Sequence, residues 1–184
     1  MHFHKSSTYS LKVLIKDLLD YSRIGSKKEL EQVDCNKTLQ EVLADLGAAI
    51  DEAKADIDHN SLPVVSGYPT ELKQLFQNLI INAIKFRKKG ISPQMKISAE
   101  KINGNWEFAF KDNGIGIEKK HSEKIFHIFQ RLHSRAEYEC SGIGLSHCKK
   151  IVELHKGKIW VDSMPGEGST FNFTLPVSPY ENNN

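Results

Sequence analysis

Three short segments constrain the fold of this chain more than any other feature. They are residues 78–86 (NLIINAIKF), 112–117 (DNGIGI) and 142–145 (GIGL). Each combines apolar residues with the amide, carboxylate or glycine groups that small-ligand pockets use for orientation. Any one of them alone is a weak signal, and the three can line one pocket only in a fold that brings distant parts of the chain together.

Length and charge limit the class of protein. The 184 residues suffice for one α/β domain with a short appendage. Lys and Arg number 25 against 23 Asp and Glu, so the nearly balanced charge gives no argument for a nucleic-acid partner. The three cysteines form no CxxC pair, and no apolar run reaches the roughly 18 to 20 residues that span a bilayer. We expect a cytoplasmic chain, even if its parent protein is anchored in a membrane.

The N-terminal part has its own pattern. Apolar residues at three- and four-residue steps predict an amphipathic helix over residues 9–23, carried by Leu11, Leu14, Leu18 and Tyr21. Residues 25–28 (GSKK) break this pattern and predict a hinge. We therefore divide the chain into a helix and hinge over 1–25, a main domain over 26–178 and a polar tail over 179–184.

In the main domain, short strands and long helices alternate at first. A strand is predicted near residues 31–33, followed by one helix that Asp34 or Asn36 caps and whose apolar face extends to Ile50. Strands follow near 55–58 and 62–65. Pro69 suits the first turn of the next helix, which is predicted to continue to about Lys88, so that residues 87–89 form a solvated basic end.

The second half of the domain predicts a sheet. Strands over 95–102 and 106–111 flank Asn103-Gly104, a dipeptide that favours a tight hairpin. A helix over 146–155 precedes two further strands, 158–161 and 170–175, which a turn at 165–168 connects. The order of elements predicts a two-layer α/β sandwich, a mixed sheet with helices on one face, plus the N-terminal helix.

The first segment carries side chains suited to metal and phosphate. Asn78, Asn82 and Lys85 are spaced by four and three residues, so they project from one side of the predicted helix. The amide oxygen of Asn82 suits Mg²⁺, and Lys85 can contact phosphate oxygens. An isolated pair of asparagines more often caps or supports neighbouring loops.

The other two segments are rich in glycine. Asp112 ends a predicted strand, and its carboxylate can accept a hydrogen bond from a ligand. Gly114 and Gly116 let the backbone turn sharply beside it. Alone, Asp-Asn-Gly predicts only a turn. Gly142 and Gly144 precede the helix predicted from Ser146, and their amides could receive a phosphate.

Together and in this order, the segments resemble the ATP-binding domain of sensor histidine kinases, within the gyrase, chaperone, kinase and MutL (GHKL) superfamily with its Bergerat fold. The resemblance implies that Asn82 binds Mg²⁺, that Lys85 contacts phosphate and that Phe86 borders the adenine. It also makes Asn78, with Asn82 and Lys85, a catalytic and nucleotide-binding residue. It assigns the adenine to Asp112, Gly114, Gly116 and Ile117, and the phosphate loop to Gly142, Ile143, Gly144 and Leu145. Residues 125–140 resemble the family's F box and ATP lid, with Phe126 and Phe129 as anchors and Arg131 and Arg135 as candidate phosphate contacts.

Two positions depart from the family pattern. Ser146 stands where a glycine is frequent, which affects the shape of the phosphate loop. Tyr68 replaces an acidic residue before the N-box helix, and this change should affect helix capping more than nucleotide chemistry.

The resemblance also implies an activity and partners. The domain would transfer the γ-phosphoryl group of ATP to a His of a dimerisation domain, in a parent protein that forms a homodimer and signals to a response regulator. Residues 14–24 resemble the end of that dimerisation domain, but the phosphoacceptor is missing, since His4 precedes Lys5 and lies too close to Leu11. An ATP-driven clamp, or a module that only binds or hydrolyses ATP, is the alternative. The histidines lack zinc-ligand spacing.

Overall fold

The computed structural model describes residues 29–130 and 142–177, together with 19, 22, 24 and 25. Its main sheet has the strand order β2-β4-β5-β7-β6, in which only the β2–β4 pair is parallel. These strands are β2 (Asp56–His59), β4 (Gln94–Ile102), β5 (Asn105–Asp112), β6 (Ile159–Met164) and β7 (Gly168–Pro176). The mixed sheet agrees with the prediction from sequence.

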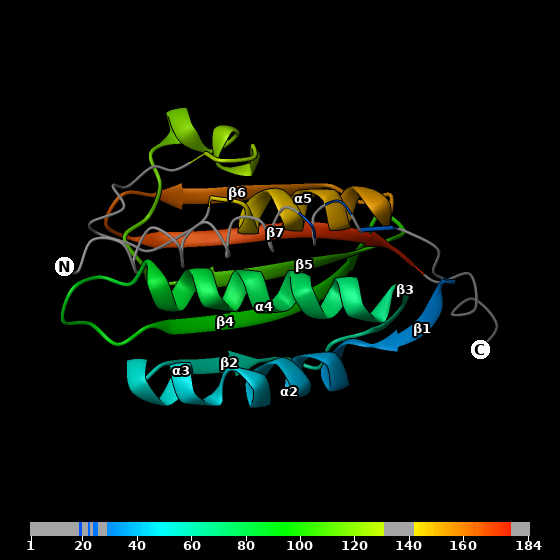
Figure 1. The fold of residues 1–184 in the computed structure, drawn as a ribbon, viewed down its shortest axis with the longest axis horizontal. Helices are drawn as coiled ribbons and strands as arrows, with labels where there is room; N and C mark the ends of the chain where they lie inside the picture. Colours follow the sequence, from blue (N-terminus) through cyan, green and yellow to red (C-terminus); the bar gives the residue numbers. More distant parts are fainter. Residues whose placement is uncertain (1–18, 20–21, 23, 26–28, 131–141, 178–184) are drawn as a thin grey trace, which may run out of the picture.

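Helices cover one face of this sheet, as Figure 1 shows. They are α2 (Cys35–Asp45), α3 (Gly47–Ala53), α4 (Pro69–Lys85) and α5 (Gly144–Leu154). A separate antiparallel pair joins β1 (Glu31–Asp34) to β3 (Val64–Gly67), and two short 3-10 turns, η1 (Lys119–His121) and η2 (Lys124–Phe126), follow β5. The two-layer α/β sandwich is therefore confirmed. Among the described helices, none combines the length and apolar character that crossing a membrane requires.

An aromatic cluster joins the two layers. The ring of Phe76 on α4 lies 6.1 Å from that of Phe108, 5.3 Å from that of Phe110 and 6.4 Å from that of Phe173, measured between centroids. Phe108 and Phe173 stack at 4.8 Å across the β5–β7 pair. All four side chains are fully buried, so this cluster fixes α4 over the centre of the sheet.

Local signals predicted several boundaries correctly. Asn103 and Gly104 have φ angles of 50° and 76°, as the tight hairpin between β4 and β5 requires. Asp34 caps α2, because its Oδ1 accepts the N–H groups of Asn36 at 2.8 Å and Lys37 at 3.3 Å. Tyr68 precedes α4 without any side-chain cap hydrogen bond, which agrees with the expected effect on capping.

Three helix boundaries differ from the prediction. The single helix expected up to Ile50 is two helices, since Leu46 leaves helical geometry with φ −95° and ψ 3° just before Gly47. Helix α4 ends at Lys85 rather than Lys88, because the carbonyl of Phe86 turns to accept the N–H of Ile115 at 3.0 Å. Helix α5 begins at Gly144 rather than Ser146.

The segment after η2 is a further difference. Phe126 is buried, with its ring 6.5 Å from that of Phe171, as expected of an anchor. Phe129 is 59% exposed and has a φ of +61°, so the prediction that it is a second anchor was wrong. The left-handed backbone at Phe129 is a local feature that sequence periodicity does not reveal. Arg131, Arg135 and most of the predicted N-terminal helix lie outside the described residues.

Candidate functional site

Helix α4 connects the three segments that the sequence singled out. Near its middle, Gly144 of the third segment lies beside Asn78, since a Cβ atom on that glycine would be 3.7 Å from Asn78 Oδ1. At its end, Phe86 accepts the N–H of Ile115 from the second segment. The fold thus places the Asp112 loop at one end of α4 and the glycine loop about two turns away along the same helix.

Asp112 is a buried carboxylate with two backbone donors. Its Oδ1 accepts the N–H of Gly114 at 2.7 Å and that of Ser169 at 3.2 Å. Burial raises the pKa of this carboxyl group, while these two hydrogen bonds and the charge of Lys88 oppose the rise. Both hydrogen bonds go to Oδ1. Among the described residues, none donates to Oδ2, so this oxygen is available to a ligand.

The basic residues after α4 are only partly a solvated end. Arg87 is exposed and its Nη1 donates to the carbonyl of Ile84 at 2.8 Å, as expected for a cation that satisfies a helix C-terminus. Lys88, however, is half-buried, and its charge favours ionised Asp112. The interpretation of Lys88 as a purely solvated residue was wrong because α4 ends early and turns this stretch toward the loop.

Two glycines in the second segment are required by close contacts. A Cβ atom at Gly114 would lie 2.7 Å from both Asp112 Oδ1 and the Phe86 carbonyl oxygen. Gly116 has a φ of +72°, and a Cβ atom there would overlap the Met164 carbonyl oxygen. Larger residues at these positions would push the loop away from α4 and from the β6–β7 turn.

The asparagines of α4 have unsatisfied donors. The Nδ2 atoms of Asn78 and Asn82 are buried and find no hydrogen-bond partner among the described residues. A buried donor without a partner costs about 1 to 3 kcal/mol, which favours a ligand that supplies acceptors here. Phosphate oxygens fit the N–H groups, and a carboxamide oxygen suits Mg²⁺.

The other predicted site residues occupy different environments. Lys85 is exposed, and Phe86 and Ile117 are half-buried. Gly142 has a φ of +75°. The Ile143 side chain is fully buried and that of Leu145 packs against the core, so their backbone groups are what they can offer a ligand. Arg131 lies outside the described residues.

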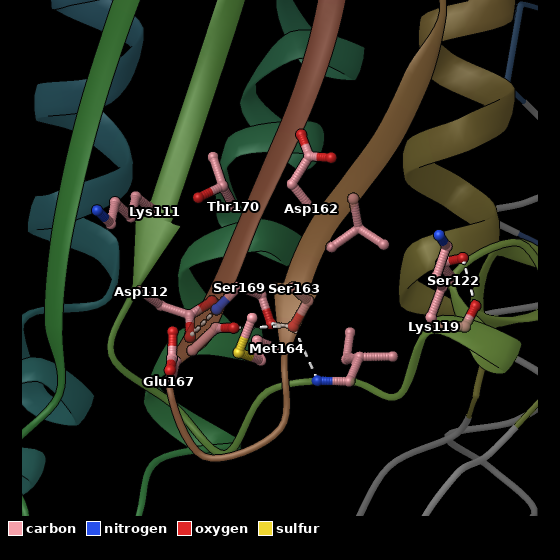
Figure 2. Close-up of a pocket in the computed structure, with 13 residues that line it drawn as sticks. Lys111, Asp112, Lys119, Ser122, Asp162, Ser163, Met164, Glu167, Ser169 and Thr170 are labelled. Atoms are coloured by element: carbon pink, nitrogen blue, oxygen red, sulfur yellow. Dashed lines mark hydrogen bonds between the residues drawn. The ribbon is translucent and has the colours of Figure 1, made fainter.

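Two serines near Asp112 were missed by the sequence analysis. Figure 2 shows Ser163 and Ser169 beside Asp112 in a cavity of about 550 Å³ that Ile117 also lines. Neither Asn78 nor Asn82 lines this cavity. The alternation of Phe171 and Phe173 along β7 could have indicated that Ser169 faces the same side of the sheet. Its pairing with Asp112 depends on strand register, which the sequence does not specify.

Comparison with known proteins identifies the family. Residues 67–179 match the family model described as "Histidine kinase-, DNA gyrase B-, and HSP90-like ATPase". Cyanobacterial phytochrome A of Nostoc sp. (strain PCC 7120) is 48% identical over 172 residues, which cover 93% of this chain and 22% of that protein. The chain thus spans about a fifth of the length of this relative.

Solved structures show the same fold. The catalytic domain of histidine kinase ThkA is 28% identical with a TM-score of 0.70, and the match covers 84% of this chain and 99% of that one. ThkA in complex with the response regulator protein TrrA is 25% identical with a TM-score of 0.71, over 96% of this chain and 50% of that one. The chain therefore belongs to the family of histidine kinase-, DNA gyrase B- and HSP90-like ATPases.

Proposed function

We propose that this chain is the ATP-binding catalytic part of a sensor histidine kinase. The observation that carries the proposal is the arrangement along α4. A buried carboxylate, Asp112, lies at one end, with both of its hydrogen bonds on Oδ1. Asn78 and Asn82 follow along the helix, and their buried Nδ2 atoms find no hydrogen-bond partner among the described residues. This spacing suits a ligand with a hydrogen-bond donor at one end and a chain of anionic oxygens at the other.

Each site residue has a proposed role. Asp112 accepts a hydrogen bond from the adenine amino group, beside Phe86 and Ile117. Asn78, Lys85, Arg131 and the amides of residues 142–145 contact the phosphates. Asn82 would hold Mg²⁺, which supplies charge neutralisation to the phosphates when bound. These groups orient the γ-phosphorus so that an imidazole nitrogen of an acceptor His forms a bond to it as the bond to the β-phosphate oxygen breaks.

The acceptor and partners are proposed from the relatives. We infer that residues 26–178 form the catalytic domain, and that the acceptor His belongs to a dimerisation domain of a homodimeric parent protein. The complex of ThkA with a response regulator supports a receiver domain as the partner that takes the phosphoryl group onward. A cytoplasmic location suits the dimerisation domain, the second copy of the parent protein and the receiver domain.

Calorimetry with ATP tests the nucleotide site. We expect binding that requires Mg²⁺ and that weakens at least about tenfold in Asp112→Asn and in Asn82→Ala, since each loses a charge-assisted or metal contact. Asp58→Asn, an exposed carboxylate on β2, serves as the control and should keep wild-type affinity. Unchanged affinity in both site variants would remove the proposed pocket.

Phosphate transfer distinguishes a kinase from a module that only binds or hydrolyses ATP. With labelled ATP, this chain should phosphorylate a separately produced histidine-kinase dimerisation domain that carries its acceptor His, and should not label itself. Labelling on His2 or His4 would contradict the proposal. ATP binding without transfer to the supplied domain would favour the binding module instead.

A further inference from the structure

The β4–β5 hairpin presents charged residues on the sheet face that lies opposite the helices, called the outer face below. Side chains alternate between the two faces of a strand. On β4 and β5, residues such as Ile97 and Phe110 belong to the core beneath the helices (Figure 1). The residues between them therefore project from the outer face. They are Lys96, Ser98 and Glu100 on β4, and Glu107, Ala109 and Lys111 on β5.

Like charges lie directly opposite each other on this face. Lys96 pairs with Lys111, and Glu100 pairs with Glu107. Directly opposed side chains have their Cβ atoms about 4.5 to 5.5 Å apart, and like charges at this spacing destabilise the pairing of the strands. Exchanging one lysine with one glutamate would give two attractive pairs instead. The pattern therefore brings no advantage to a single copy of the hairpin.

The neighbouring strands do not neutralise these four charges. Lys96, Lys111 and Glu100 are exposed, and Glu107 is half-buried. None of the four side chains forms an ion pair with another described residue, although Asp58 of β2 lies opposite Lys96. On β7, only threonines lie opposite Lys111 and Glu107. The outer face thus offers a lysine row and a glutamate row to a partner.

The two rows are placed so that the outer face complements itself. On each strand they are four residues apart, which is about 13 Å, and the small pair Ser98–Ala109 lies midway between them. A two-fold axis that crosses the strands above this small pair brings the glutamate row of a second copy over the lysine row of the first, and the reverse. A two-fold axis along the strands would instead set lysines against lysines.

We propose that the outer face binds the outer face of a second copy of this chain, through the lysine and glutamate rows. The small side chains of Ser98 and Ala109 lie at the axis, where they let the two sheets approach each other. This contact uses only residues of the main domain, so it differs from the contact that a dimerisation domain provides. It is also independent of the proposed nucleotide site.

Sedimentation velocity of the whole chain at increasing protein concentration tests this contact. We expect reversible dimers. Their dissociation constant should rise at least about tenfold in the double variant Lys96→Glu/Lys111→Glu, and likewise in Glu100→Lys/Glu107→Lys, because each change sets like charges against each other across the interface. Each variant replaces one like-charge pair of the hairpin by another, so the fold itself should tolerate it, which circular dichroism checks.

A mixture of the two double variants is the decisive measurement. One variant then has four glutamates on its outer face and the other has four lysines, so the mixture should associate at least as tightly as wild type. Lys37→Glu/Lys124→Glu makes the same change in net charge at exposed positions of α2 and η2, and should associate as wild type does. Raising the salt from about 0.01 M to about 1 M shortens the screening length from about 30 Å to about 3 Å and should weaken the wild-type dimer.

Three results would overturn the inference. A wild-type chain that stays monomeric would leave the outer face to a partner of another kind. Association that both double variants retain would place the contact elsewhere, for example in the predicted N-terminal helix. A mixture that associates no better than its two components would show that the rows do not face each other. ATP binding enters none of these measurements, so the proposed function stands or fails separately.

Discussion

At the scale of single residues, His155 joins the end of α5 to the start of α4. Its Nδ1 lies 2.7 Å from the carbonyl of Ile151, and its Nε2 accepts the backbone N–H of Tyr68 at 3.0 Å. Protonation at Nε2 would place two donors against each other. Burial lowers the pKa of His155, although the hydrogen bond to Ile151 and the charge of Glu71 oppose this.

We therefore expect His155 to make the fold sensitive to mild acid. The unfolded chain takes up a proton near the ordinary pKa of about 6.5, before the folded protein does. Stability from this group is present above that pH and is lost as the pH falls from 7 toward 5. The loss should be smaller in His155→Gln than in wild type, as measured by thermal unfolding, while His59→Gln, an exposed histidine, should match wild type. Equal slopes for all three proteins would contradict this role.

At the scale of elements, the junction between α4 and the Asp112 loop leaves no space at Gly114. The Phe86 carbonyl that a Cβ atom would meet is itself fixed by the N–H of Ile115. Gly114→Ala should therefore cost about 1 to 3 kcal/mol in urea unfolding. Gly47→Ala is the matched control, because nothing lies within 4 Å of its added methyl group and alanine favours the helix α3. A loss of stability in the control as large as that in Gly114→Ala would show that steric crowding is not the cause.

The same junction shows which parts of the fold could be predicted from the sequence. The β4–β5 hairpin and the start of α4 were predicted correctly because Asn103-Gly104 and Pro69 act through local backbone geometry. The end of α4 was not predicted correctly, because the Phe86 carbonyl accepts the N–H of Ile115, in a loop almost thirty residues later. Likewise, Asp112 could be recognised from its glycine neighbours, whereas the row it forms with two serines exists only through strand register.

At the scale of the whole molecule, the site depends on a helix layer held over a sheet. Asn78 and Asn82 reach the site because α4 is fixed by Phe76, which enters the aromatic cluster between β5 and β7. Phe129, equally aromatic, is 59% exposed. The sequence predicted Phe129 as an anchor of its segment, and only the packed fold shows that this side chain is exposed.

This contrast predicts two different outcomes from the same substitution. Phe76→Ala should lose about 3 to 5 kcal/mol of unfolding free energy, since a buried ring leaves a cavity between the layers. Phe129→Ala should change stability by less than about 0.5 kcal/mol, as exposed positions do. Urea unfolding followed by circular dichroism measures both. A cost for Phe129→Ala similar to that for Phe76→Ala would mean that the segment after η2 is part of the core, and the assignment of α4 and its aromatic cluster as the support of the site would have to be revised.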